Sequence, residues 1–374
     1  MANNNDKKVL NVPALRFPEF TGEWENITIR EACSEFQSGK NIKAEMINDQ
    51  GLYPVYGGNG LRGFTGSYNH DGDYILIGRQ GALCGNVRKV TGKTYVTEHA
   101  IAVCASKEHE TTFLQHLFQK MRLGQYSDQS AQPGLAVNKL LRLNINVPSK
   151  IEQGKIAKIL SLIDERITTQ NKIIEDLKKL KSAIIDKLYS STNGEIYSFR
   201  QLFEVVNEKN KARAYKNVLS ASQELGMIER SDINIDIKFE QESISGYKIV
   251  HKGDYVVHLR SFQGGFAFSD RTGICSPAYI ILRPNDLVVY GYLSHFFTSK
   301  PFIKSLKLVT YGIRDGRSIN VDEWLDMPIL LPPAQEQIRI LTIVNAIDAK
   351  LHNEVKVQFC LSSQKSYLLN TMFI

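Results

Sequence analysis

Apolar residues recur at alternating intervals of four and three along two stretches of the chain. This alternation is typical of the seam of a left-handed coiled coil, because it keeps the apolar residues on one face of a helix. Each stretch begins just after a proline segment, where the fixed φ angle suits a helix start. The seam positions that we expect to pair the helices or to hold other subunits are Ile156, Leu160, Ile163, Ile167, Ile174 and Leu177 in the first stretch and Ile340, Val344, Ile347 and Leu351 in the second.

The second stretch repeats the first at a constant offset of 184 residues, without a gap. Pro148, Glu152, Gln153, Ile156, Ile159, Ile163 and Asp164 recur as Pro332, Glu336, Gln337, Ile340, Ile343, Ile347 and Asp348, and Lys181-Ser182 recurs as Lys365-Ser366. A weaker similarity upstream relates Phe113–His116 to Tyr292–His295. A repeat of this length indicates a duplicated domain, since solenoid repeats are far shorter.

The repeat predicts an α+β protein with two duplicated globular domains, separated by two long antiparallel coiled-coil helices and related by a pseudo-twofold axis. At 374 residues the chain is long enough for each domain to bury its own core. The expected boundaries are residues 1–148 for the first domain, 149–193 for the central helix, 194–331 for the second domain and 332–374 for the C-terminal helix.

Two packing arrangements remain open for the helices. Each helix either lies on its own domain as part of an ordinary core or pairs with the other over several heptads, and the length of the seam favours pairing. In one antiparallel register Gln170 faces Gln358. Apolar residues outside the seam suggest that helices of another protein pack there as well. These residues are Ile159, Ile173, Leu180 and Ile185.

Short strands punctuated by glycine are expected in both domains, followed by a helix. The expected strands are Asp73–Ile77, Val87–Val90 and Ala100–Val103 with a helix at 112–121, and Asp254–Leu259 and Ala278–Leu282 with Tyr290–Phe297 in the second copy. Glycine, amide and arginine residues alternate in the loops between them. Arginine pairs with guanine through two hydrogen bonds, and Asn or Gln does so with adenine. The candidate DNA contacts are Asn59, Arg62, Arg79, Gln80, Arg260, Gln263, Arg314 and Arg317.

Each of these loops taken alone is equally typical of a surface turn with solvated arginines. The occurrence of Arg followed by Gln in both halves favours a shared role. Six further cations suit contacts to phosphate or plain solvation. They are Lys43, Arg88, Lys89, Arg213, Lys216 and Arg271.

The chain is moderately basic, with 46 Lys and Arg against 39 Asp and Glu, which favours an anionic partner such as nucleic acid. Its five cysteines have neither C-x-x-C spacing nor a neighbouring pair of histidines, so we expect reduced thiols and no zinc site. The N-terminus lacks the apolar core of a signal peptide, and no apolar run reaches the length of a membrane helix. A cytoplasmic protein without membrane contact is expected.

Signatures of catalysis are weak in this sequence. Gly58–Gly63 matches G-x-G-x-x-G, but a turn-rich stretch follows it where a dinucleotide site needs a helix. The chain has no G-x-x-x-x-G-K-[ST] loop and no N/D-P-P-Y/F tetrapeptide of amino-methyltransferases. Glu354-Val355-Lys356 has the E-x-K spacing of nuclease sites, yet it lies within the expected C-terminal helix. We therefore expect a protein that binds and connects.

The duplicated architecture resembles the specificity subunits of type I restriction-modification enzymes. In that family two variable domains are each followed by a helix that opens with P-x-x-x-E-Q, as at Pro148 and Pro332 here. Val12–Phe20 with Trp24, the Tyr53–Gly60 loop and Ile77–Leu83 also resemble family members. The second half departs from the first, because it has no Y-G-G-N-G run and has His258–Gly265 in place of the Ile77–Leu83 stretch.

The resemblance implies two target-recognition domains, each binding half of a split, asymmetric target in double-stranded DNA. The paired helices would set the spacing and dock two modification (methyltransferase) subunits, through which restriction subunits attach. S-adenosylmethionine, ATP and Mg would then lie on partner subunits, and this chain would be non-catalytic and hold no metal. A coiled-coil scaffold without DNA recognition and a self-sufficient methyltransferase or nuclease remain alternatives.

Overall fold

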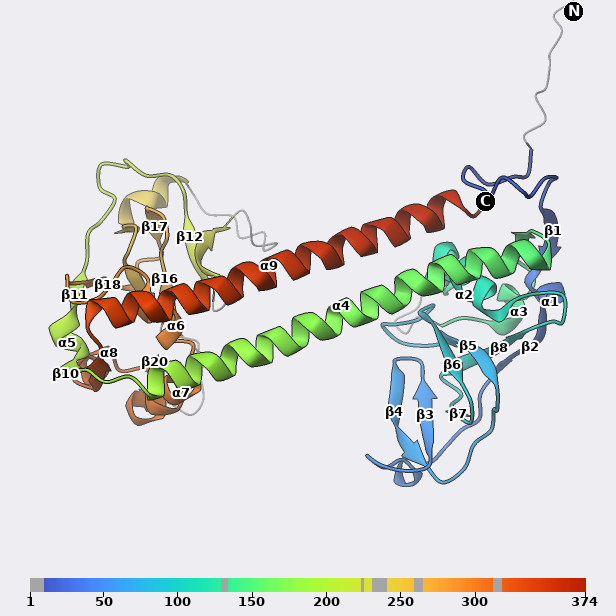
Figure 1. Ribbon diagram of the computed structural model, residues 1–374, viewed down its shortest axis with the longest axis horizontal. Helices are drawn as coiled ribbons and strands as arrows, with labels where there is room; N and C mark the ends of the chain where they lie inside the picture. The colour runs from blue at the N-terminus through green and yellow to red at the C-terminus, as the bar shows by residue number, and fades with distance from the viewer. Residues whose placement is uncertain (1–9, 129–133, 223–224, 231–240, 259–264, 312–317) are drawn as a thin grey trace, which may run out of the picture. The chain divides into compact units, whose positions relative to one another are not determined.

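The computed structural model describes residues 10–128, 134–222, 225–230, 241–258, 265–311 and 318–374 (Figure 1). It divides into two compact units, residues 1–171 with 356–374 and residues 172–355. The long helices α4 (Lys150–Ser190) and α9 (Ala334–Thr371) contribute to both units. Within the described residues no helix is long and apolar enough to cross a membrane.

The first unit is built on two sheets and a short strand pair. Strands β2, β8, β5 and β6 form a four-stranded antiparallel sheet in that order, β4, β3 and β7 form a second sheet, and β1 pairs with β9. The elements are β1 (Glu25–Thr28), α1 (Ile29–Ala32), β2 (Cys33–Ser38), η1 (Ala44–Met46), β3 (Tyr53–Gly57), β4 (Gly60–Thr65), β5 (Asp73–Gly78), β6 (Val87–Thr91), β7 (Tyr95–Val96), β8 (Ala100–Ala105), α2 (Thr111–Met121), η2 (Leu123–Tyr126), α3 (Val137–Leu140) and β9 (Asn144–Val147).

The second unit repeats this framework. Its four-stranded sheet has the order β11, β18, β15 and β16, and β10 pairs with β21 as β1 pairs with β9. The elements are β10 (Glu195–Ser198), α5 (Phe199–Leu202), β11 (Phe203–Val206), β12 (Leu219–Ser222), β13 (Gly226–Glu229), η4 (Gln241–Gly246), β14 (Lys248–Val250), β15 (Tyr255–Val257), β16 (Phe266–Phe268), β17 (Gly273–Cys275), β18 (Ile280–Pro284), α6 (Tyr292–Phe296), α7 (Lys300–Ser305), η5 (Leu306–Val309), β19 (Thr310–Tyr311), β20 (Ser318–Ile319), α8 (Val321–Leu325) and β21 (Pro328–Leu331). The α+β fold with two duplicated domains is confirmed.

Capping residues begin the same short helix in both units. Thr28 caps α1 together with Glu31, and Ser198 caps α5 together with Gln201. In each capping box the hydroxyl accepts from a backbone N–H, and the N3 side chain accepts from the backbone N–H of the cap residue. The duplicated sequence thus turns the chain from the first strand of each unit into its sheet in the same way.

The glutamine of the repeated P-x-x-x-E-Q motif joins each long helix to the domain before it. Gln153 is fully buried, donates to Pro148 O (2.9 Å) and accepts from the backbone N–H of Glu110, the N-cap of α2. Gln337 donates to Pro332 O (2.9 Å) and accepts from Val289 N (2.8 Å). Buried amide groups without such partners are costly, so these bonds fix where each helix starts.

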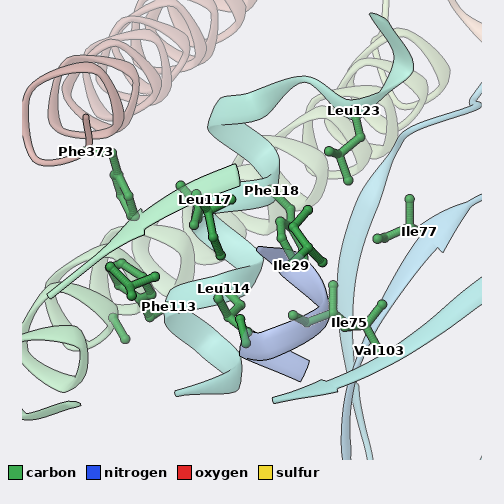
Figure 2. Packing of buried hydrophobic residues seen from close by; sticks show 14 of the residues in the cluster. Ile29, Ile75, Ile77, Val103, Phe113, Leu114, Leu117, Phe118, Leu123 and Phe373 are labelled. Atoms are coloured by element: carbon green, nitrogen blue, oxygen red, sulfur yellow. The ribbon is translucent and has the colours of Figure 1, made fainter. Parts of the chain in front are cut away.

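Each hydrophobic core contains residues of both long helices. The first core contains Ile156, Leu160 and Ile163 of α4 with Leu368 and Met372 of α9. Figure 2 shows its centre, where α2 and the four-stranded sheet meet and Phe373 lies beside Phe113. The buried residues labelled in Figure 2 are Ile29, Ile75, Ile77, Val103, Phe113, Leu114, Leu117, Phe118, Leu123 and Phe373.

The second core contains Ile185 of α4 and Ile340 and Val344 of α9. At both ends the helices therefore pack on a domain and on each other, so the two packing arrangements that the sequence left open coexist. Ile185 was expected outside the seam as exposed apolar surface, and this was wrong. The side chain is 4% exposed because the second domain covers it.

All the seam positions expected from the sequence are at least partly buried. Ile156, Leu160, Ile163, Ile340 and Val344 are buried. The half-buried ones are Ile167, Ile174, Leu177, Ile347 and Leu351. Gln170 is buried and Gln358 half-buried, both in the first unit. The helices run antiparallel in each unit (Figure 1), with Lys365 of α9 beside Asp164 of α4 in the first and Lys181 beside Asp348 in the second.

Candidate nucleic-acid interface

Three loops of the first unit meet at the end of strand β5. The first is the turn at Gly58-Asn59 between β3 and β4, the second begins with Arg79 directly after β5, and the third is Glu98-His99 before β8. Arg79 N donates to His99 O (2.9 Å), and Leu135 N donates to Arg79 O (2.9 Å). Backbone hydrogen bonds therefore hold the second loop between two neighbours.

Glycine allows these loops to approach one another. A Cβ atom on Gly58 would lie 2.8 Å from His99 O and 3.1 Å from Gln80 O, so a side chain there would push the loops apart. Gly60 has a φ of 105°, and a Cβ atom on it would lie 2.7 Å from the guanidinium of Arg88. The Gly-Gly-Asn-Gly run is thus explained by close packing, and the hairpin that contains it has no following helix for a dinucleotide.

The side chains at this junction are polar and largely exposed. Asn59, Arg62 and Gln80 are exposed, whereas Arg79 is half-buried. Arg79 Nη1 makes one long contact, 3.4 Å to Glu98 O, and Gln80 Oε1 lies 3.0 Å from His99 Nδ1. The structure brings Asn59, Arg79 and Gln80 onto neighbouring loops, with Arg62 close by on strand β4.

Two basic residues add to this surface. Arg88 of β6 lies against Gly60, and His99 lies beside Gln80. Neither Arg62 nor Arg88 forms an ion pair with any described residue, so both guanidinium groups keep their donors for another partner. Sequence reasoning grouped Arg88 with the phosphate contacts and missed His99, because only strand pairing brings residue 99 to residue 79.

Lys89, in contrast, is already bound within the protein. Its Nζ lies 3.0 Å from Asp73 Oδ2 and donates to Thr112 Oγ1 (3.1 Å). Lys89 forms these contacts because β6 alternates its side chains between faces, which points residue 89 away from the side of Arg88. The Lys89 hydrogen bond lowers the pKa of Asp73 below its ordinary value. We therefore do not count Lys89 among the contacts of this surface.

The predicted contacts of the second unit, Arg260, Gln263, Arg314 and Arg317, lie outside the described residues. On either side of residues 259–264, His258 N donates to Gly265 O (2.6 Å). Strands β15 and β16, which flank this segment, are neighbours in their sheet, as β5 and β6 are in the first unit. In the sequence, Arg79 and Arg260 thus follow corresponding strands of the two units.

The chemistry of the first surface suits recognition of bases and phosphates. Guanidinium and amide groups supply the donors and acceptors that pair with guanine and adenine edges. Backbone N–H groups in glycine loops approach phosphates closely. Among the described residues no group of three or more His, Cys, Asp or Glu side chains is placed to hold a metal ion. Glu354-Val355-Lys356 lies within α9, as the sequence predicted, and not on a strand.

The exposed apolar residues of the helices form a second candidate surface. Ile173 and Leu180 of α4, seven residues apart, are 39% and 51% exposed. Ile159, predicted with them, is only half-buried and packs against the first core. Seven residues are two helical turns, so Ile173 and Leu180 share one face.

A family model described as type I restriction modification DNA specificity domain matches residues 21–179. The EcoprrI specificity subunit of Escherichia coli is 41% identical over 173 residues, which are 45% of this chain and 42% of that relative. This chain thus matches less than half the length of that relative. A putative type I restriction enzyme specificity subunit of Haemophilus influenzae, S.HindORF215P, is 24% identical over 92% of this chain and 93% of its own length.

Solved structures with the same fold cover nearly the whole chain. The S subunit of a type I restriction-modification system from M. genitalium has a TM-score of 0.64 at 17% identity and covers 97% of this chain and 99% of its own. A chain from a structure of complex assembly and conformational transition of the type I R-M system has a TM-score of 0.57 at 13% identity, over 94% of this chain and 97% of its own. At these identities the likeness concerns the fold.

Proposed function

We propose that this chain is a specificity subunit of a type I restriction-modification enzyme and that it recognises a bipartite, asymmetric target in double-stranded DNA. The observation that carries the proposal is the proximity of Asn59 and Arg62, from the β3–β4 hairpin, to Arg79 and Gln80, from the loop after β5, where close backbone contacts join the two segments. Preorganised loops that present exposed guanidinium and amide groups lose less conformational entropy when they bind a base.

The two units recognise different half-sites in this proposal. The first presents the Gly58-Asn59 turn, and no such run exists in the second. The four-stranded sheets share one strand order, whereas the loops that they carry differ in sequence. The paired helices hold the half-sites at a fixed gap.

The exposed helix face would dock two modification subunits, which in turn attach restriction subunits. Ile173 and Leu180 are its candidate contacts, because an apolar side chain on a solvent-exposed helix favours a partner helix. Replacing both with Asp should prevent co-elution with the modification subunit in size-exclusion chromatography. Leu52→Asp, at an exposed apolar residue of the first domain, is the matched control and should leave assembly intact.

Chemistry resides on the partners in this proposal. We assign S-adenosylmethionine, ATP and Mg to them, and this chain acts in the cytoplasm, where the DNA is, as a non-catalytic subunit. Incubating the isolated chain with target DNA and labelled S-adenosylmethionine should give no methyl transfer, whereas adding the modification subunit should. Transfer by the isolated chain would support the methyltransferase alternative.

The deciding experiment maps methylated bases in cells that express the chain with its modification subunit. We expect one bipartite motif with a constant gap. Methylation without a motif, or a chain whose complex shows no salt-dependent DNA binding, would favour a coiled-coil scaffold instead.

A further inference from the structure

Each unit contains an ion pair that joins the two long helices. In the first unit Lys365 Nζ of α9 lies 2.6 Å from Asp164 Oδ1 of α4. In the second, Lys181 of α4 pairs with Asp348 of α9. These are the same two positions of the repeat, with the roles of the helices exchanged, because Asp348 repeats Asp164 and Lys365 repeats Lys181.

A histidine of the globular domain lies beside each ion pair. His116 Nδ1 of α2 lies 3.9 Å from Asp164 Oδ2, and Gln119 Oε1, also of α2, accepts from Lys365 Nζ (3.0 Å). His295 Nε2 of α6 lies 4.0 Å from Asp348 Oδ2. His116 and His295 also correspond in the repeat, so the duplication has preserved a cluster of three residues from three helices.

These groups are not ordinary solvated surface charges. The His116 side chain is 1% exposed, and the paired charges are partly buried, since Lys365 and Asp164 are 19% and 34% exposed and Lys181 and Asp348 26% and 37%. Burial lowers the pKa of His116 to about 4 and also lowers the pKa of His295, so both are neutral near pH 7. Each cluster then has one positive and one negative charge. Partly buried pairs of this kind contribute little net stability but penalise arrangements that separate the charges.

The apolar seam alone does not define one register. A seam that repeats every seven residues remains apolar when one helix slides by seven residues, about 10 Å along its axis. The charges oppose this, because a slide would separate Lys365 from Asp164 and Lys181 from Asp348. The same 17-residue interval separates Asp164 from Lys181 and Asp348 from Lys365, so a single antiparallel register satisfies both pairs.

We propose that two equivalent clusters of positioning residues fix the register of the two helices and the position of each domain on them. The clusters are Asp164, Lys365 and His116 in the first unit and Asp348, Lys181 and His295 in the second. They thereby set the gap between the two half-sites. This inference rests on the proposed function for the gap, although the register itself is independent of DNA. A slide of one heptad would correspond to about three base pairs at ~3.4 Å each.

The first test compares Lys365→Asp with the exchange Asp164→Lys/Lys365→Asp in the complex with modification subunits. Methylation is measured on duplexes whose gap varies one base pair at a time. We expect the single reversal to reduce the preference for the native gap at least fivefold and the exchange to restore it within twofold. Glu175→Ala/Lys179→Ala removes an exposed pair on α4 and should change nothing. Lys365→Met, which keeps the stem and removes the charge, should give an intermediate effect.

The second test needs no DNA. Spin labels at the exposed positions Glu165 and Ser363, with Cys360 replaced by Ser, report the distance between α4 and α9 in the first unit. We expect one distance in the parent, a second population in Lys365→Asp and one distance again in the exchange. An unchanged distribution in the single reversal, or a second population that the exchange does not remove, would overturn the inference. A parent with one distance but no gap preference would instead count against the proposed function.

Discussion

The two units share a backbone framework and differ in how its core is filled. Around α5 and α8 the second unit packs rings on one another, with Trp324 stacked on Phe199 at a centroid distance of 4.2 Å. The first unit fills its sheet face mainly with aliphatic residues such as Ile75, Ile77 and Ile101. Strand order and helix contacts survived duplication because hydrogen bonding specifies them, whereas a core accepts different residues of suitable total volume.

The surfaces differ even more than the cores. In the first unit β3 and β4 join β7 in a three-stranded sheet, whereas among the described residues of the second unit β12 and β13 form a two-stranded sheet, beside which Val218 makes one parallel bridge to Ile274. The residues that attach each domain to the long helices, in contrast, recur in both units. They are Gln153 and Gln337 of the helices and His116 and His295 of the domains. The comparison indicates that attachment to the helices is constrained and that the recognition surface is free to vary.

The largest effect that we expect is a loss of stability in the second unit alone. Trp324→Ala should destabilise the second unit by about 3–5 kcal/mol, because it removes a fully buried ring from a packed core. The chain has two tryptophans, and the other, Trp24, lies in the first core. In Trp324→Ala, the fluorescence of Trp24 during denaturant unfolding should report the same unfolding midpoint for the first unit as in the parent protein. An equal shift of the Trp24 transition would show that the units unfold as one.

Removing the candidate base contacts should affect one half-site only. Arg79→Ala and Gln80→Ala should each weaken binding by about 1–3 kcal/mol if the side chain makes two hydrogen bonds to a base. Competition with targets altered in one half-site at a time measures this. Lys178→Ala, at an exposed residue of α4, is the control. Equal loss of discrimination at both half-sites would contradict a division of recognition between the units.

The glycine packing provides a related test. Gly58→Ala should force the three loops apart and cost about 1–3 kcal/mol through overpacking, with weaker recognition of the first half-site. Gly66→Ala is the matched control, since a Cβ atom there meets no atom within 4 Å. We expect Gly58→Ala to bind the target DNA more weakly than Gly66→Ala does. If Gly58→Ala binds like Gly66→Ala, the interlocked loops do not determine recognition.

The smallest effect concerns pH. The pKa of His116 falls to about 4 on folding, mainly through burial, against about 6.5 in an unfolded chain. The unfolded state therefore binds more protons in this interval, and stability falls as the pH drops from about 6.5 to 4. His116→Gln should reduce this loss for the first unit, as followed by Trp24 fluorescence. His295→Gln should leave the Trp24 signal unaltered, and a similar effect of both variants would contradict the assignment.

The sequence by itself determined the helices, the duplication and the type of fold. The spacing of Ile156, Leu160 and Ile163 identified a helical face because side-chain direction follows helix geometry, which is local. The strands 73–77 and 100–103 were likewise found within a residue or two, as β5 and β8. The sequence also showed that an Arg followed by a Gln occurs in a glycine-containing loop of each half, at Arg79 and Gln80 and at Arg260 and Gln263.

Only the tertiary structure decided which of these residues meet. His99 joins Arg79 through strand pairing, and Lys365 joins Asp164 and His116 through the packing of helices that are far apart in the chain. The sequence shows that Ile185 is an apolar residue of a helix, but only the structure shows that the core of the second unit buries it. Such contacts depend on the position of segments distant in sequence, and the identity of one residue carries no information about which distant residue will be its neighbour.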